Sequence, residues 1–156
     1  VVVVLLFTFL FRVVNVNGQS MEDTIHNEDK VLLTNLFYEP ENGDVVVISR
    51  AQHFEEPIIK RVIATEGQTL KIDFNTGDVY VDGVLLNEPY IKTPTTNNEG
   101  GEVPEVIPEG YVFVMGDNRG NSLDSRSEQI GLIDKRNIIG KAQYIVFPFD
   151  RIGGIG

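Results

Sequence analysis

The chain has 156 residues, enough for one domain or for a core with an insertion. Its 13 basic and 23 acidic side chains give a formal net charge of −10, which argues against nucleic acid as a partner because phosphate binding needs a cationic face. The sequence has no cysteine, which excludes disulfides and thiolate sites, and only two histidines, so we predict neither a metal nor another cofactor.

Residues 1–11 read VVVVLLFTFLF, with Thr8 as the only polar side chain. The stretch is shorter than the ~20 apolar residues of a membrane-spanning helix. It lacks a preceding basic residue and a small-residue cleavage site, so it is not a complete signal peptide. The valines are compatible with a buried strand. We favour the end of a transmembrane anchor whose first part is missing, because an apolar terminus of this length is hard to bury in a small domain.

The rest of the chain predicts strands rather than long helices. Short segments rich in β-branched residues alternate with turn signals, and Asp82-Gly83 is a strong hairpin signal. The expected strands are 12–17, 29–37, 45–49, 58–65, 70–74, 79–81, 84–86, 111–115 and 138–147. Residues 92–109 and 116–126 are expected to be polar loops, and 134–137 a helical turn. The predicted fold class is mainly β, with a coiled or barrel-like sheet.

The histidines do not indicate a Ser-His-Asp triad. His26 lies too close along the chain to Ser20 to oppose it across a cleft, and His53 sits in a polar segment. We expect both to be surface residues.

Lys60 lies in an apolar strand beside Arg61, and alternation places the two on opposite faces. A buried lysine has a lowered pKa, and its neutral amine is a general base that can deprotonate a serine, as in Ser-Lys catalysis. The alternative is an edge-strand lysine that extends to water. Ser20, which follows Gly18-Gln19, is the candidate nucleophile, although taken alone it reads as a turn residue.

Four sequence blocks together resemble the type I signal peptidases, membrane-anchored Ser-Lys proteases, and in particular their Gram-positive branch. The blocks are GQSMEDTI at 18–25, GDVVV at 43–47, IKRVIA at 59–64 and GDNRGNSLDSR at 116–126. The last block is long and highly specific. The resemblance runs from about residue 9 to residue 152 and includes the closing FPFDRI.

The resemblance implies a role for each matching position. Ser20 would be the nucleophile and Lys60 the general base. Ser122 would hydrogen-bond the Lys60 amine and orient it, and Asp124 and Arg126 would form a supporting ion pair.

Three further positions would border the reaction site. Met21 and Val114 would line apolar surface, and the Ser20 N–H would hold the oxyanion. Some members of the family add a hydroxyl two residues before the nucleophile. That position is Gly18 here, so a backbone or water contact would have to serve instead.

The family usually has proline where this chain has Asp23. Proline would fix the turn after the nucleophile. A negative charge at Asp23, if it lay near the amine, would favour protonated Lys60 and weaken the base.

The implied function is removal of signal peptides from exported preproteins with small residues before the cut. The chain would be single-pass anchored in the cytoplasmic membrane and in contact with its lipid, with the catalytic domain on the extracytoplasmic face. In this interpretation residues 1–11 end the anchor, 12–65 and 109–156 form the catalytic β core, and 66–108 are a β-hairpin and loop insertion.

Three alternatives stay open. A non-catalytic signal-peptidase homologue would act as an assembly or binding factor for surface proteins. A repressor-type Ser-Lys autoprotease would share the dyad and a similar fold, but the chain has no DNA-binding domain. A plain β-barrel interaction module would make the joint pattern an accident.

Overall fold

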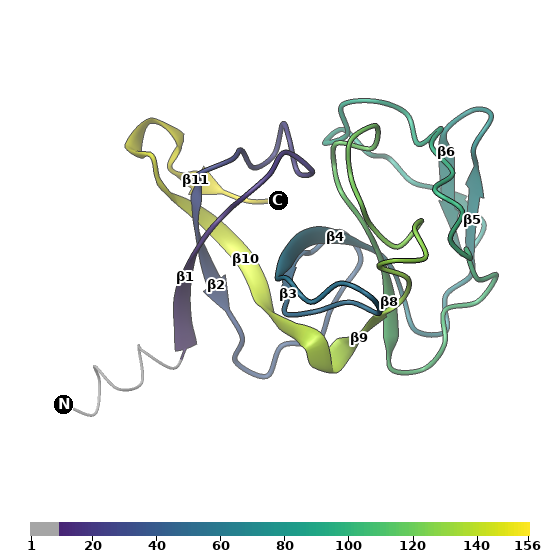
Figure 1. Ribbon diagram of the computed structural model, residues 1–156, viewed down its shortest axis with the longest axis horizontal. Coiled ribbons are helices and arrows are strands. Elements are labelled where there is room, and N and C mark those ends of the chain that lie inside the picture. The colour runs from purple at the N-terminus through teal and green to yellow at the C-terminus, as the bar shows by residue number, and fades with distance from the viewer. Residues whose placement is uncertain (1–9) are drawn as a thin grey trace.

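The computed structural model describes residues 10–156, and its main feature is an antiparallel sheet that curls into a half-barrel (Figure 1). The sheet has eight strands in the order β1-β2-β10-β3-β4-β8-β9, with β11 paired to β10. These strands are β1 Phe11–Asn15, β2 Lys30–Thr34, β3 Val45–Ile48, β4 Ile58–Thr65, β8 Tyr111–Met115, β9 Ile133–Asp134, β10 Ile138–Phe147 and β11 Gly153–Gly154.

The long strand β10 explains why the sheet curls. It pairs with β2 along one part of its length and with β3 along another, and both pairings contain register shifts. Irregularities of this kind increase local twist and bend a strand. The two halves of the sheet therefore wrap around a shared core instead of lying flat.

A second sheet of three strands lies beside β4 and β8, at the end of the molecule away from β1 and β2 (Figure 1). Its strands are β5 Leu70–Asp73, β6 Asp78–Val81 and β7 Val84–Leu85. Asp82 and Gly83 both have positive φ in the two-residue turn between β6 and β7, as a tight hairpin requires. One apolar cluster, which includes Ile63, Val79 and Phe113, joins the small sheet to the large one.

The predicted fold class and the principal strands are confirmed. The strand expected at 29–37 ends at Thr34, and Phe37 has positive φ and is exposed. The helical turn is the 3-10 helix η1 Lys135–Asn137, whose first turn is capped by the Asp134 side chain. The strands β9 and β11 and the 3-10 helix η2 Phe149–Arg151 were not predicted, since they are only two or three residues long.

Most of the stretch interpreted as the end of an anchor, residues 1–9, lies outside the described residues, and Phe11 already belongs to β1. No helix in residues 10–156 is long and apolar enough to cross a membrane.

Candidate active site

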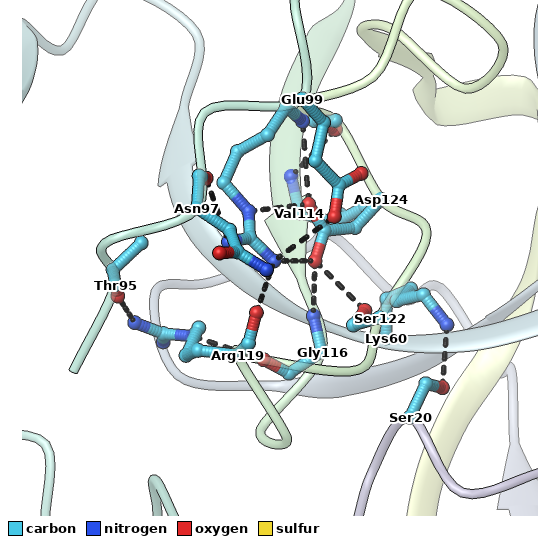
Figure 2. Close-up of polar contacts among 12 residues, drawn as sticks. Ser20, Lys60, Thr95, Asn97, Glu99, Val114, Gly116, Arg119, Ser122 and Asp124 are labelled. Atoms are coloured by element: carbon cyan, nitrogen blue, oxygen red, sulfur yellow. Dashed lines mark hydrogen bonds and ion pairs between the residues drawn. The ribbon is translucent and has the colours of Figure 1, made fainter. Parts of the chain in front are cut away.

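Lys60 occupies the middle of β4, between β3 and β8, and is almost entirely buried. Its Nζ lies 2.7 Å from Ser20 Oγ and also donates to the Ile59 carbonyl at 3.0 Å. Figure 2 shows the two side chains meeting from different parts of the chain. The fold thus joins a hydroxyl and an amine that are 40 positions apart.

Burial lowers the pKa of the Lys60 amine to about 8, against the opposing charges of Asp124, Asp117 and Glu99. The charged form loses its hydration in the apolar interior, and the three carboxylates recover only part of that loss. Lys60 is therefore neutral in a substantial fraction of molecules just above neutral pH, which is the form that can accept a proton.

Ser20 is held through its backbone. Its carbonyl oxygen accepts a hydrogen bond from the Asn118 N–H at 2.9 Å, and the Asn118 side chain donates to the Gln19 carbonyl. Gly18 precedes it with φ of 101°, a conformation that disfavours residues with a Cβ. The turn that carries Ser20 therefore packs against the 116–126 loop, and its conformation depends on that loop as well as on its own sequence.

Gly116 is the point of closest approach between these segments. A Cβ at this position would overlap Ser122 Oγ and the Ser20 carbonyl oxygen. The glycine is therefore needed for its lack of a side chain, so that the loop can pack against the Ser20 turn.

Asp124 and Arg126 form a fully buried ion pair with an N–O distance of 2.8 Å. Asp124 also accepts hydrogen bonds from the Gly116 N–H and from Ser122 Oγ. The structure does not form the expected hydrogen bond between Ser122 and the Lys60 amine: Lys60 donates to Ser20 and to the Ile59 carbonyl, and Ser122 donates to Asp124 at 2.8 Å (Figure 2).

Arg61 points away from Lys60, as strand alternation predicts, yet it is equally buried. Its guanidinium binds both oxygens of Asp117, at 2.8 and 2.7 Å, and lies 3.9 Å from the centre of the Tyr90 ring. Thr24 donates to the same carboxylate. Both faces of β4 at this level therefore carry buried cations.

The structure adds a third buried arginine that the sequence alone did not single out. Arg119 binds Glu88 through two hydrogen bonds, at 2.6 and 3.0 Å, and also donates to Thr95. Arg119 lies within the last sequence block, but neither Glu88 nor Thr95 belongs to any motif. Contacts from residues 86–101 to the 116–126 loop could not be read from spacing.

The remaining candidate residues occupy separate surroundings. Met21 and Val114 are fully buried, but they belong to different apolar clusters. Asp23 is exposed and lies 3.5 Å from Lys92 Nζ, and it is not among the charges that act on Lys60. The fold therefore directs this carboxylate away from the amine.

The expectation that both histidines are surface residues is confirmed, since His26 and His53 are exposed. His53 lines a cavity of about 1110 Å³ that includes neither Ser20 nor Lys60. Over residues 10–156 no three histidine or acidic side chains are grouped so as to hold a metal ion.

Comparisons with known proteins place this geometry in context. A family model described as "Signal peptidase, peptidase S26" matches residues 1–147. A signal peptidase I of Bacillus licheniformis is 34% identical, over 97% of this chain and 85% of that protein. A probable signal peptidase I-1 of Synechocystis is 39% identical, over 89% and 72%. The crystal structure of a signal peptidase I from Enterococcus faecalis matches with a TM-score of 0.55 and 27% identity, over 67% of this chain and 97% of that chain.

Proposed function

Because the chain belongs to the signal peptidase family, peptidase S26, we propose that it removes signal peptides with Ser20 as the nucleophile and Lys60 as the general base. The observation that carries the proposal is the 2.7 Å contact between Lys60 Nζ and Ser20 Oγ in a buried setting. The lowered pKa of Lys60, about 8, supports the role of base.

The reaction begins when neutral Lys60 accepts the proton of the Ser20 hydroxyl and Oγ attacks the scissile carbonyl carbon. The resulting oxyanion is held by the Ser20 N–H. The ammonium of Lys60 then protonates the leaving amine, the C–N bond breaks, and an ester to Ser20 remains. Water, deprotonated by Lys60, hydrolyses that ester and restores the dyad. The scheme uses no metal or organic cofactor.

The Asp124–Arg126 pair acts as support in this scheme. It fixes Ser122 and the Gly116 N–H, and Gly116 packs against the Ser20 turn. A buried ion pair with satisfied hydrogen bonds holds its neighbours in one arrangement. Met21 and Val114 are fully buried in two separate apolar clusters, so in this scheme they support the core behind the site and do not touch the substrate.

The substrates are preproteins with signal peptides, and we propose that they are exported ones bound in extended form beside an exposed strand. We also propose attachment to the extracytoplasmic face of the cytoplasmic membrane, with the residues that precede β1 as the end of a single anchor, since Phe11 belongs to that strand. Three exposed apolar residues near the end of the chain, Phe147, Phe149 and Ile152, support contact with lipid. Residues 66–108, which contain the small sheet, form an insertion between the two parts of the catalytic core.

The deciding experiment is cleavage of a preprotein-derived peptide in detergent by the wild-type chain and by Ser20→Ala and Lys60→Ala. A single cut after the small residue, lost in both variants, is expected. Lys71→Ala is the matched control, since Lys71 is exposed on β5. No cut by the folded chain with a full anchor would contradict the proposal and favour the non-catalytic assembly or binding factor.

A further inference from the structure

The charges around Lys60 are nearly all balanced in pairs. Three arginine side chains are fully buried, and each has a carboxylate within 2.8 Å. The pairs are Arg61 with Asp117, Arg119 with Glu88, and Arg126 with Asp124. Among these groups, only the Lys60 amine has no carboxylate bonded to it, because its hydrogen-bond partners are Ser20 Oγ and the Ile59 carbonyl.

Glu99 is a further acid in this cluster, and it is not hydrogen-bonded to any of the three buried arginines. Its Oε1 lies 4.0 Å from Arg126 Nη2, whose guanidinium already has bidentate bonds to Asp124. Within residues 10–156, Glu99 Oε2 is the one buried side-chain nitrogen or oxygen without a hydrogen-bond partner. An unpartnered buried oxygen is costly, so its position calls for a charge nearby that compensates it.

The backbone on both sides of Glu99 fixes the side chain in this position. The Asn97 carbonyl accepts from Arg126 Nη1 at 3.1 Å, and the Gly101 N–H donates to the Arg126 carbonyl at 2.7 Å. Figure 2 shows the Glu99 side chain extending from this loop toward the Asp124 pair, in the cluster that also contains Ser122 and Lys60. The loop that carries Glu99 is therefore held against Arg126 by hydrogen bonds on both sides of Glu99, which places its carboxylate in the cluster.

We propose that Glu99 is a positioning residue that provides the counter-charge for protonated Lys60 and thereby sets the pH range in which the dyad works. The inference rests on the proposed Ser-Lys function. The Glu99 carboxylate has only a 4.0 Å ion pair with Arg126 and one oxygen without a hydrogen bond, and the Lys60 amine has no bonded carboxylate, so each favours the charged form of the other.

The electrostatics of both groups agree with this role. Glu99 raises the pKa of Lys60, as do Asp124 and Asp117, while burial lowers it. On balance the pKa of Glu99 is raised by burial and by the charge of Asp124, while Arg126 and, to a smaller extent, Lys60 lower it. Asp124 and Asp117 act on Lys60 more strongly than Glu99 does, but each is hydrogen-bonded to an arginine, whereas Glu99 is the one of the three without a directly hydrogen-bonded cation.

Two kinetic effects follow from this counter-charge. Removing it lowers the pKa of Lys60, so the amine is neutral from a lower pH. Removing it also leaves the ammonium that forms during acylation less stabilised, with only Asp124 and Asp117 to favour it, so the maximal rate falls. A residue that only supports the fold would lower activity without moving the acidic limb of the pH profile.

The test compares kcat/KM against pH for the wild-type chain, Glu99→Gln and Glu99→Asp. We expect Glu99→Gln to shift the acidic limb of the kcat/KM profile to a pH lower by about 0.5 unit, and to lower the plateau of kcat/KM about 3-fold. Glu99→Asp, which keeps the charge, should retain the wild-type limb. Glu102→Gln is the matched control, because it removes an equal charge from an exposed position in the same loop.

A second readout separates failure of this inference from failure of the proposed function. The ¹³C resonance of the carbon next to Nζ of Lys60, assigned with Lys60→Arg, reports its pKa by NMR without any cleavage. A lower pKa in Glu99→Gln supports the counter-charge role even if no peptide is cut. An active, folded Glu99→Gln with an unchanged limb and an unchanged Lys60 pKa would overturn it.

Discussion

Lys60 and Arg61 are neighbours in β4, point to opposite faces of the strand, and are both buried. Their protonation behaviour differs because their partners differ. Arg61 contacts a carboxylate, Asp117, at 2.7 Å, whereas Lys60 contacts a hydroxyl, Ser20 Oγ. An arginine stays charged in such a pair, while a buried lysine without a bonded acid gives up its proton more readily. One strand therefore holds both a permanent structural cation and a titrating amine.

The pH dependence of cleavage should follow Lys60. Burial lowers the pKa of its amine to about 8, and only the neutral amine accepts the serine proton. We expect kcat/KM to fall about tenfold per pH unit below this value, as a single essential base requires. Peptide cleavage measured from pH 6 to pH 10 checks this, and a flat profile across that range would rule out Lys60 as the base.

Lys60→Met should stabilise the fold while abolishing activity. The folded pKa of about 8 lies below the ordinary value of 10.5, so the unfolded chain binds the proton more tightly and the charged amine opposes folding at pH 7. We expect the free energy of unfolding at pH 7 to rise by about 1–3 kcal/mol.

Denaturant titrations of the wild-type chain and of Lys60→Met measure this difference. The difference in the free energy of unfolding between the two chains should narrow as the pH rises from 8 toward 10.5, because Lys60 of the wild-type chain then loses its proton in the unfolded state too. Lys71→Met, on the exposed face of β5, should show neither effect. A destabilised Lys60→Met would mean that the amine contributes packing or hydrogen bonds that outweigh its desolvation.

Asp117→Asn should destabilise the fold strongly. Arg61 would keep its buried charge but lose its carboxylate, and the single amide oxygen of asparagine could not accept all the hydrogen bonds that Arg61 and Thr24 now donate to the two carboxylate oxygens. Breaking a buried pair from one side costs about 3–5 kcal/mol. Urea unfolding measures the loss. The control is Arg136→Ala, which removes an exposed arginine from an ion pair with Asp134 and should cost under about 1 kcal/mol.

Gly116→Ala should inactivate the protein without unfolding it. The added methyl group would meet Ser122 Oγ and the Ser20 carbonyl oxygen, so the nucleophile turn must move. A displacement of about 1 Å can cost roughly 100-fold in rate. Peptide cleavage together with a thermal melt separates the two effects. Gly153→Ala, whose Cβ would find ordinary contact distances, should keep full activity.

Local sequence was sufficient for the strands and for the Asp82-Gly83 hairpin, because side-chain alternation and turn chemistry act over a few residues. It also indicated Ser20 and Lys60 as partners, through four blocks in a fixed order, and the expected exposure of both histidines is confirmed.

The tertiary structure decided how the buried charges are distributed. Ser122 binds Asp124 and not Lys60, and Asp23 turns away toward Lys92. Glu99, which comes from a polar loop without a motif, lies 4.0 Å from Arg126 and has one buried oxygen without a hydrogen-bond partner. The contacts of Asp23 and Glu99 join segments far apart in the sequence, and the energy of a buried charge depends on every group around it. The sequence alone therefore indicated Ser20 and Lys60 as the proposed pair, whereas the surroundings that set the pKa of Lys60 emerged only from the fold.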